Sequence, residues 1–514
     1  MKRLFIIAGL VAMLGGLFSS CKKQLADDYL DPESTTTGTL GRLFTAMFLN
    51  ERIHPTYWDY RTFILITTAV NAQTAVNYPS SSMWIPNSTY GENRWTDFYS
   101  GSPGILNQYL EMKTTYAALT ETQQEEQYVY LELAKIVMFD QAAQMVDLWG
   151  DIPFSEAGSL NTDRVATNPA FDDAATVYST IIDSLASINT YLASVSLTSA
   201  VEADVEAQDL IYGGDLTYWR RYANSLRLRL LMRISNYDEA TAKSAVTTML
   251  ADETTYPLID DNEYNAVFNM SPTDYVSNLL SAFTEGYPYA PAYLLDTVMD
   301  ANGDPRTDVF WDKPIDSYKG IPTGAGAGVY DTAAGYYATY DSATFLYNYN
   351  VPGVLFTASE TDFLKAEAYE RWSLGTASTP YYAGIEASID FYYDINQSRV
   401  LSSGSYATVT SPTDSAITAY EAKTAIAYSG TSTEKLEKIY TQKWEHFFIL
   451  QAGQAWAELR RTGYPTLTFY TAGSSASQPP TRLLYPSTET LYNTNYSSVS
   501  ASDTRDTKIF WDVN

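Results

Sequence analysis

Apolar residues recur every three or four positions over long stretches of this chain, and this helical period constrains its fold more than any other feature. From about Gln123 to Trp149 the apolar side chains step by three and four, and Gly150 then supplies a stop. Strict alternation of apolar and polar residues is rare. We therefore predict a mainly α-helical protein with few, short strands.

A second helix is predicted to begin at the N-cap residue Asp215 and to carry an apolar stripe from Trp219 to Ile234. Five arginines lie toward the other faces of this helix, namely Arg220, Arg221, Arg227, Arg229 and Arg233. We expect them to pair with carboxylates of neighbouring helices, and an anion site is the alternative.

Two further segments form a predicted helix pair. They run from Glu360 to Trp372 and from about Tyr382 to Tyr393, and the short connection between them gives a helix-turn-helix unit of tetratricopeptide size. Near the C-terminus, an apolar stripe from Leu436 to Leu459, closed by Gly463 and Pro465, predicts one more long helix.

Three segments between the helices have a different character. Residues 69–99, 286–293 and 311–350 are rich in Pro, Gly, Ser and Tyr and show no 3.6-residue period. Loops of this length are uncommon in a compact protein and usually carry function, and their aromatic content argues against disorder. The chain has 43 Tyr and 10 Trp, whose apolar faces and polar tips suit stacking on ligands at a wet surface.

The N-terminus resembles the export signal of a bacterial lipoprotein. Lys2 and Arg3 precede an apolar run at residues 4–18, which is too short to span a bilayer, and the only cysteine, Cys21, follows closely. We predict a signal peptide at residues 1–20, lipidation of Cys21, a polar tether at 21–39 and one large body at 40–514. An accidental cysteine beside a cleavage site is the alternative.

The charge of the chain excludes several partners. Sixty acidic residues against 32 Lys and Arg give a net charge of −28, which repels nucleic acid phosphates and anionic lipid headgroups. We therefore expect no nucleic acid partner, and membrane contact only through the N-terminal lipid.

Catalytic and metal-binding patterns are scarce. The only histidines are His54 and His446, and the second falls inside a predicted amphipathic helix, where packing is its expected role. Residues 300–304 begin like a calcium loop, but Pro305 stands where that loop needs Gly and Trp311 where it needs the closing Glu, so we interpret them as a polar turn. We expect no catalytic residue, no metal and no cofactor. A hydrolase that uses a pair of carboxylates stays open as an alternative.

Several segments together resemble the SusD/RagB family of nutrient-binding outer-membrane lipoproteins, in its SusD-like branch. Their order along the chain, with the lipoprotein signal, makes the resemblance specific. The matching segments are Asp147–Phe154 followed by Ser155–Ala157, Asp209–Asp215 with Trp219, Ala223–Arg229 through Met232–Ile234, Asp304–Arg306, Glu360–Ala368 and Glu458–Pro465.

The resemblance implies a mainly helical scaffold of tetratricopeptide-like helix pairs with a loop-rich ligand-binding face. It also implies a non-enzymatic protein at the outer membrane that binds an oligosaccharide, or in some members a peptide, and delivers it to a SusC-like TonB-dependent transporter. Ligand residues vary within the family, so our binding candidates are aromatic residues of the three aperiodic segments. They are Tyr78, Trp84, Tyr90, Tyr287, Tyr289, Tyr336 and Tyr337.

Overall fold

A computed structural model describes residues 38–76, 84–85, 88–101, 103–159, 168–270, 279–285, 288–315, 317–324, 328–329, 335–470 and 476–514. The predicted signal peptide, Cys21 and nearly all of the predicted tether lie outside these residues, as do Tyr78 and Tyr287. Within the described part of the chain, no helix combines the length and the apolar character that crossing a bilayer requires.

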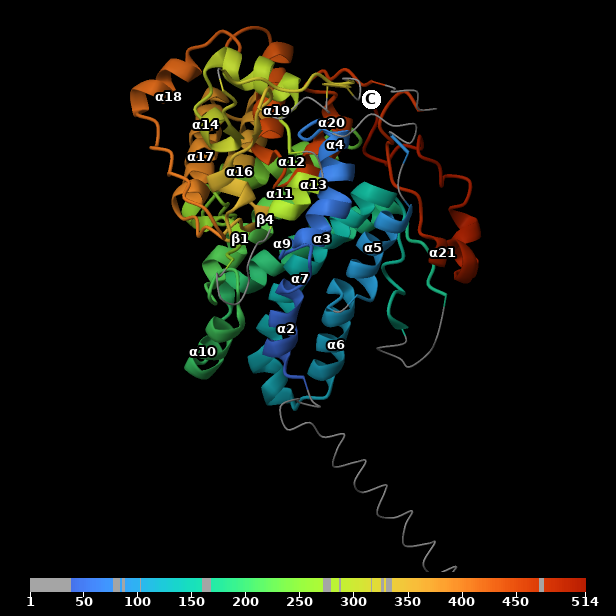
Figure 1. The fold of residues 1–514 in the computed structure, drawn as a ribbon. Helices are drawn as coiled ribbons and strands as arrows, with labels where there is room; N and C mark the ends of the chain where they lie inside the picture. Colours follow the sequence, from blue (N-terminus) through green and yellow to red (C-terminus); the bar gives the residue numbers. More distant parts are fainter. Residues whose placement is uncertain are drawn as a thin grey trace, which may run out of the picture.

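The structure is mainly helical, which confirms the predicted fold class (Figure 1). The α-helices of the first half are α2 (Leu40–Phe48), α3 (Tyr57–Asp59), α4 (Ala69–Asn71), α5 (Ser88–Tyr99), α6 (Ile105–Ala117), α7 (Glu121–Trp149), α9 (Ala174–Ser194), α10 (Ser199–Gln208), α11 (Leu216–Arg233) and α12 (Glu239–Ala251). Those of the second half are α13 (Leu280–Glu285), α14 (Thr307–Phe310), α16 (Ala358–Trp372), α17 (Ser378–Gln397), α18 (Asp414–Glu421), α19 (Ser432–Phe447), α20 (Ala452–Thr462) and α21 (Ser487–Tyr492).

Shorter elements connect these helices. Among the described residues, three π-helical segments are η1 (Tyr60–Thr68), η3 (Tyr293–Met299) and η5 (Ser342–Leu346), and three 3₁₀ turns are η2 (Asn262–Tyr264), η4 (Asp300–Asn302) and η6 (Thr494–Ser498). The strands form two small antiparallel pairs, β1 (Ala266–Phe268) with β4 (Gly353–Phe356) and β2 (Trp311–Asp312) with β3 (Thr339–Tyr340).

The predicted start of α11 and the predicted helix pair α16–α17 are present. Asp215 caps α11, because its carboxylate accepts the N–H groups of Thr217 and Tyr218 at 2.8 and 3.1 Å. Helices α16 and α17 pack closely where α17 carries Gly384; a Cβ at this position would lie 2.9 Å from the ring of Phe363. In Figure 1 this pair lies with α19 at the top of the view, while α2 and α6 extend toward the bottom.

Two sequence predictions are wrong. The stripe from Leu436 to Leu459 is not one helix, because the chain breaks after α19 at Phe448, whose φ is 41°, and resumes as α20. The apolar period cannot reveal this break, because residues 447–450 are all buried and apolar, so the pattern continues through the turn without a gap. The segment 69–99, predicted to lack helices, contains α4 and α5, and α5 buries Trp95 against Trp149 of α7 with ring centroids 5.2 Å apart.

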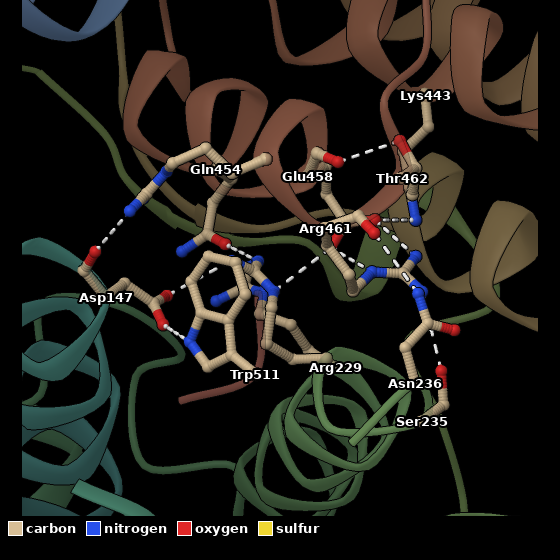
Figure 2. Close-up of polar contacts among 12 residues, drawn as sticks. Asp147, Arg229, Ser235, Asn236, Lys443, Gln454, Glu458, Arg461, Thr462 and Trp511 are labelled. Carbon is tan, nitrogen blue, oxygen red and sulfur yellow. Dashed lines mark hydrogen bonds and ion pairs between the residues drawn. The ribbon is translucent and has the colours of Figure 1, made fainter. Parts of the chain in front are cut away.

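A set of buried charges ties five helices together, and Figure 2 shows part of it. Glu458 of α20 contacts three cations, with distances of 2.6 Å to Lys443 Nζ, 2.6 Å to Arg461 Nη2 and 3.0 Å to Arg233 Nε. We define the buried ion network as three cations and three carboxylates, each side chain at most 8% exposed: Arg233, Lys443, Arg461, Asp147, Glu367 and Glu458. Charges balance within it, as a buried set requires.

The other arginines of α11 behave partly as predicted. Arg229 makes ion pairs with Glu360 at 2.5 Å and Asp140 at 3.0 Å, and Arg221 pairs with Asp260 at 2.7 Å. These contacts confirm carboxylate pairing as the role of much of the cluster. The segments that carried the family resemblance thus contain buried structural pairs.

Candidate ligand-binding face

The aperiodic segments that the sequence singled out meet in space. Backbone hydrogen bonds place residues 288–292 between residues 319–321 and residues 338–340. The N–H of Ala290 donates to the carbonyl of Ala338 at 2.9 Å, and the carbonyl of Ala290 accepts from the N–H of Ile321 at 2.8 Å. Tyr289 forms an isolated bridge with Thr339 in the same arrangement. Segments that are about thirty and about fifty residues apart in the sequence therefore share one irregular sheet-like surface.

A fourth segment, residues 466–470, joins this surface and was missed by the sequence analysis. Its carbonyl groups accept hydrogen bonds from Gln73 Nε2, at Thr468, and from Trp84 Nε1, at Tyr470, both at 2.8 Å. Its only sequence signal is a short aromatic run after the end of α20. We call the surface formed by residues 288–293, 318–324, 335–340 and 466–470 the aromatic face.

Gly324 shows how closely these segments pack. Its φ is 78°, a conformation that favours glycine, and a Cβ at this position would lie 2.2 Å from Cγ of the Tyr470 ring. The backbone therefore lies directly against the ring of Tyr470, whose side chain remains 44% exposed. Gln73 also adopts a positive φ, 53°, and its side-chain amide oxygen Oε1 accepts a hydrogen bond from the Thr323 hydroxyl at 3.2 Å.

The predicted binding residues differ in their exposure. Tyr336 is 70% exposed, whereas Tyr289 and Tyr337 are half-buried, and Lys319 Nζ lies 5.1 Å from the centroid of the Tyr337 ring. These three tyrosines belong to the aromatic face, and Tyr336 is the one of the three that is mostly exposed. Ligand contact by any of them stays a prediction.

Trp84 and Tyr90 are placed differently. Trp84 is 6% exposed and packs edge-on against Phe469 with ring centroids 5.5 Å apart, so it supports the 466–470 segment from its buried side. Tyr90 is half-buried on α5, outside the segments that form the aromatic face. The structure brings Trp84 to the aromatic face but does not bring Tyr90 to it.

Cavities lie beside the aromatic face and away from it. A cavity of about 450 Å³ has Tyr293, at the end of the 286–293 segment, in its wall, together with Lys438 and Gln442 of α19. A second cavity, of about 400 Å³, is rich in amides and tyrosines, including Tyr212 and Asn265, and contains none of the predicted binding residues. The first is the more natural extension of the candidate site.

His446 has the packing role that the sequence predicts. His446 is buried, and its ring nitrogens contact the hydroxyls of Thr357 and Ser388 at 2.7 and 2.9 Å. Burial, helped by the charge of Arg306, lowers the pKa of His446 to about 3, so it is neutral at physiological pH and held in packing, as predicted.

The calcium-like residues form a structural turn. Asp304 makes an ion pair with Arg306 at 2.6 Å, so its carboxylate is already engaged. Among the residues that the structure describes, no group of three or more His, Cys, Asp or Glu side chains is arranged to hold a metal ion.

The chain is similar to proteins of one known family over most of its length. A SusD-like family model, described as starch-binding and associating with the outer membrane, matches residues 36–486. No curated protein matches the chain.

Solved structures with the same fold include a chitin-binding SusD homologue from Flavobacterium johnsoniae, with 22% identity over 92% of this chain and 99% of that one and a TM-score of 0.72. A SusD homologue from Parabacteroides distasonis has 20% identity over 93% of this chain and 98% of that one, with a TM-score of 0.74. One from Bacteroides thetaiotaomicron has 23% identity over 93% and 100%, with a TM-score of 0.67. At these identities the likeness concerns the fold.

Proposed function

Because the chain belongs to the SusD-like family, whose model is described as starch-binding and associating with the outer membrane, we propose that it is a cell-surface lipoprotein that binds an oligosaccharide and delivers it to a SusC-like TonB-dependent transporter. The proposal includes no chemical step on the ligand. It takes Cys21 as the lipidated residue and residues 22–39 as the tether between lipid and body.

The observation that carries the proposal is the aromatic face. Sugar rings have apolar C–H faces and hydroxyl edges, so tyrosines with exposed rings and free tips suit them. Tyr336 and Tyr470 are exposed there, with 70% and 44% of their surface accessible to solvent. Tyr289 and Tyr337 are half-buried in the same hydrogen-bonded segments. The chitin-binding homologue with this fold makes a glycan the first ligand class to test.

The charge of the protein limits the class of ligand that we expect. The net charge of −28 disfavours acidic glycans, and Lys319, beside the ring of Tyr337, is the single Lys or Arg among the residues that form the aromatic face. We therefore expect neutral oligosaccharides to bind. A peptide or amino-acid ligand on the same scaffold is the alternative, and basic or neutral peptides belong in the same titration panel.

Replacing Tyr336 with alanine is expected to weaken binding of the preferred oligosaccharide about tenfold, because an exposed ring that stacks on a sugar contributes as an interface anchor. The measurement is calorimetric titration of the detergent-solubilised full chain with chito-oligosaccharides, malto-oligosaccharides and short peptides. Tyr492→Ala is the matched control, since Tyr492 is 75% exposed on α21 and lies outside the aromatic face.

Equal affinities in both variants would remove Tyr336 from the site. Preference for peptides over every glycan would replace the glycan part of the proposal with its alternative. Trp84→Ala is a poorer test, because Trp84 is buried and its removal also leaves a cavity against Phe469.

Lipidation and the transporter partner can be tested on cells. Metabolic labelling with a fatty acid should mark the wild-type chain and leave Cys21→Ser unlabelled. Mild detergent extraction of the outer membrane should recover the chain together with a TonB-dependent barrel. An unlabelled wild-type chain would overturn the lipid anchor, and recovery without a barrel would overturn the partner.

A further inference from the structure

Trp58 is the exception among the tryptophans of this protein. Nine of the 10 tryptophans are at most 7% exposed, whereas Trp58, on α3, is 61% exposed. A single exposed ring is common on protein surfaces and does not by itself make a site. Trp58, however, also forms part of the wall of a cavity of about 290 Å³, which lies between the end of α2, α3 and α5.

The ring of Trp58 is held in place from one side. It packs against Tyr57 with ring centroids 4.9 Å apart and an interplanar angle of 75°. Tyr57 is anchored in turn, because its hydroxyl donates to Glu285 at 2.6 Å. An edge-to-face contact of this kind leaves at least one face of the indole open. The indole N–H also makes no hydrogen bond to another described residue.

The wall that α5 contributes to the cavity is polar. Asn93, Thr96 and Asp97 lie on one face of this helix, at a spacing of three and four residues, and all line the cavity. Asn93 and Thr96 are exposed, and neither side chain makes a hydrogen bond within the described part of the chain. The Asn93 amide and the Thr96 hydroxyl are therefore available to a ligand as donors and acceptors.

Contacts within the protein hold the cavity in shape. Asn50 Nδ2 donates to the carbonyls of Asp97 and Pro103, at 2.8 and 2.6 Å, and Arg52 makes an ion pair with Asp97. These contacts join the end of α2 to α5 before any ligand binds, and a preformed site costs less to occupy. Among the described lining residues, Glu51 and Asp97 oppose one cation, Arg52, so the cavity disfavours an acidic ligand.

The cavity is separate from the aromatic face. None of the described residues that line it belongs to the four segments of that face. In Figure 1, α3 lies between α2 and α4, and the chain reaches the aromatic face only after α4, at Gln73.

We propose that this cavity is a second carbohydrate subsite, in which one or two neutral sugar units stack on Trp58 and hydrogen-bond to Asn93 and Thr96. An open indole face beside short polar side chains matches a sugar, which has apolar C–H faces and hydroxyl edges. The volume of about 290 Å³ lies at the small end of ligand cavities, which suits a short part of a glycan. The inference takes its ligand class from the proposed function but concerns a different site.

A protein partner is the weaker explanation of the exposed ring. Apart from Trp58, the exposed large hydrophobic residue in the described lining is Leu49, which is 36% exposed. The core of a stable protein interface needs a larger apolar area than these two side chains provide.

The fluorescence of Trp58 allows a direct test in the solubilised full chain. Acrylamide, a neutral quencher, reaches exposed indoles first, so the difference in quenching between the wild type and Trp58→Phe reports on Trp58. Maltohexaose or chitohexaose at millimolar concentration should remove most of this difference, because a sugar on the ring shields it. If neither oligosaccharide protects Trp58, the proposal is overturned.

A double variant tests direct contact with the polar wall. Replacing Asn93 and Thr96 with alanine should raise the oligosaccharide concentration that protects Trp58 by about tenfold, the effect of losing two modest hydrogen bonds. Both side chains are exposed, so the fold should be unaffected. Thr122→Ala, at an exposed position of α7, is the control and should protect like the wild type. Unchanged protection in the double variant would contradict the proposed contacts.

Tyr336→Ala separates this subsite from the aromatic face. Protection of Trp58 should persist in that variant, and its loss would overturn the inference of a second site. Protection of Trp58 combined with unchanged calorimetric affinity in Tyr336→Ala would support the subsite and count against the aromatic face. Shielding of Trp58 only in the complex with a co-purified barrel would assign the ring to a protein contact and overturn the subsite.

Discussion

Replacing Glu458 with alanine is expected to lower the free energy of unfolding by about 3–5 kcal/mol, the cost of breaking a buried charge set by removing one partner. Glu458 is the carboxylate that contacts Arg233, Lys443 and Arg461 at 3.0 Å or less. Without it, the buried ion network keeps three cations and only two carboxylates. The remaining excess charge has no access to water, since Lys443 and Arg461 are fully buried.

The effect can be measured as the loss of unfolding free energy in urea, at neutral pH, with the slope unchanged. Glu206→Ala on exposed α10 is the control and should stay within about 0.5 kcal/mol of the wild type. A loss below about 1 kcal/mol in Glu458→Ala would mean that the surrounding helices relax or that water enters to solvate the cations.

The same network sets stability in acid. Burial alone would raise the pKa of Glu367, but the charges of Arg461 and Lys443 outweigh it and lower the pKa to about 2. For Glu458 the same two charges, with Arg233, hold the pKa well below its ordinary value. A carboxylate with a depressed folded pKa contributes stability that is complete above its unfolded pKa of 4.5. We therefore expect this contribution to disappear as the pH falls from about 4.5 toward 2.

Replacing Asp362 with asparagine is expected to stabilise the protein at pH 8 by about 2–4 kcal/mol. Burial raises the pKa of Asp362 to about 7, against the opposing charge of Lys365. A carboxyl with a raised folded pKa contributes stability that is complete below its unfolded pKa of 3.8 and is lost as the pH rises through 7. Asparagine cannot ionise, so the variant avoids this loss.

The test is a series of unfolding curves between pH 4 and pH 8. The difference between Asp362→Asn and the wild type should grow with pH across that range and level off above about pH 7. Asp183→Asn, on the exposed face of α9, should show no such trend. A constant difference at every pH would show that Asp362 ionises in the folded protein much as it does in the unfolded chain.

The helices that could be predicted from the sequence are those whose own residues signal both period and ends. Asp215 marks the start of α11, and Gly150, with a φ of 80°, follows the end of α7. The break at Phe448 carries no such signal. Its ring stacks on Phe310 with centroids 4.3 Å apart and an interplanar angle of 15°, and this contact with a distant residue belongs to tertiary structure.

The candidate site was predictable in part for the same reason. Aromatic content without a period identified the segments that contain Tyr289, Tyr336 and Tyr337, and the structure brings these together. Composition could not distinguish an exposed ring from a supporting one such as Trp84, because burial depends on the 466–470 segment that covers it. The role of that segment depends on contacts across nearly the whole chain.

Those contacts also determine when, during synthesis and folding of the chain, the aromatic face can form. The hydrogen bond from Gln73 to Thr468 spans 395 residues, and the one from Trp84 to Tyr470 spans 386. Neither can form until almost the entire polypeptide has been synthesised, and closing such long loops is slow. The aromatic face therefore matures late, and a copy truncated before residue 466 lacks the segment that finishes it.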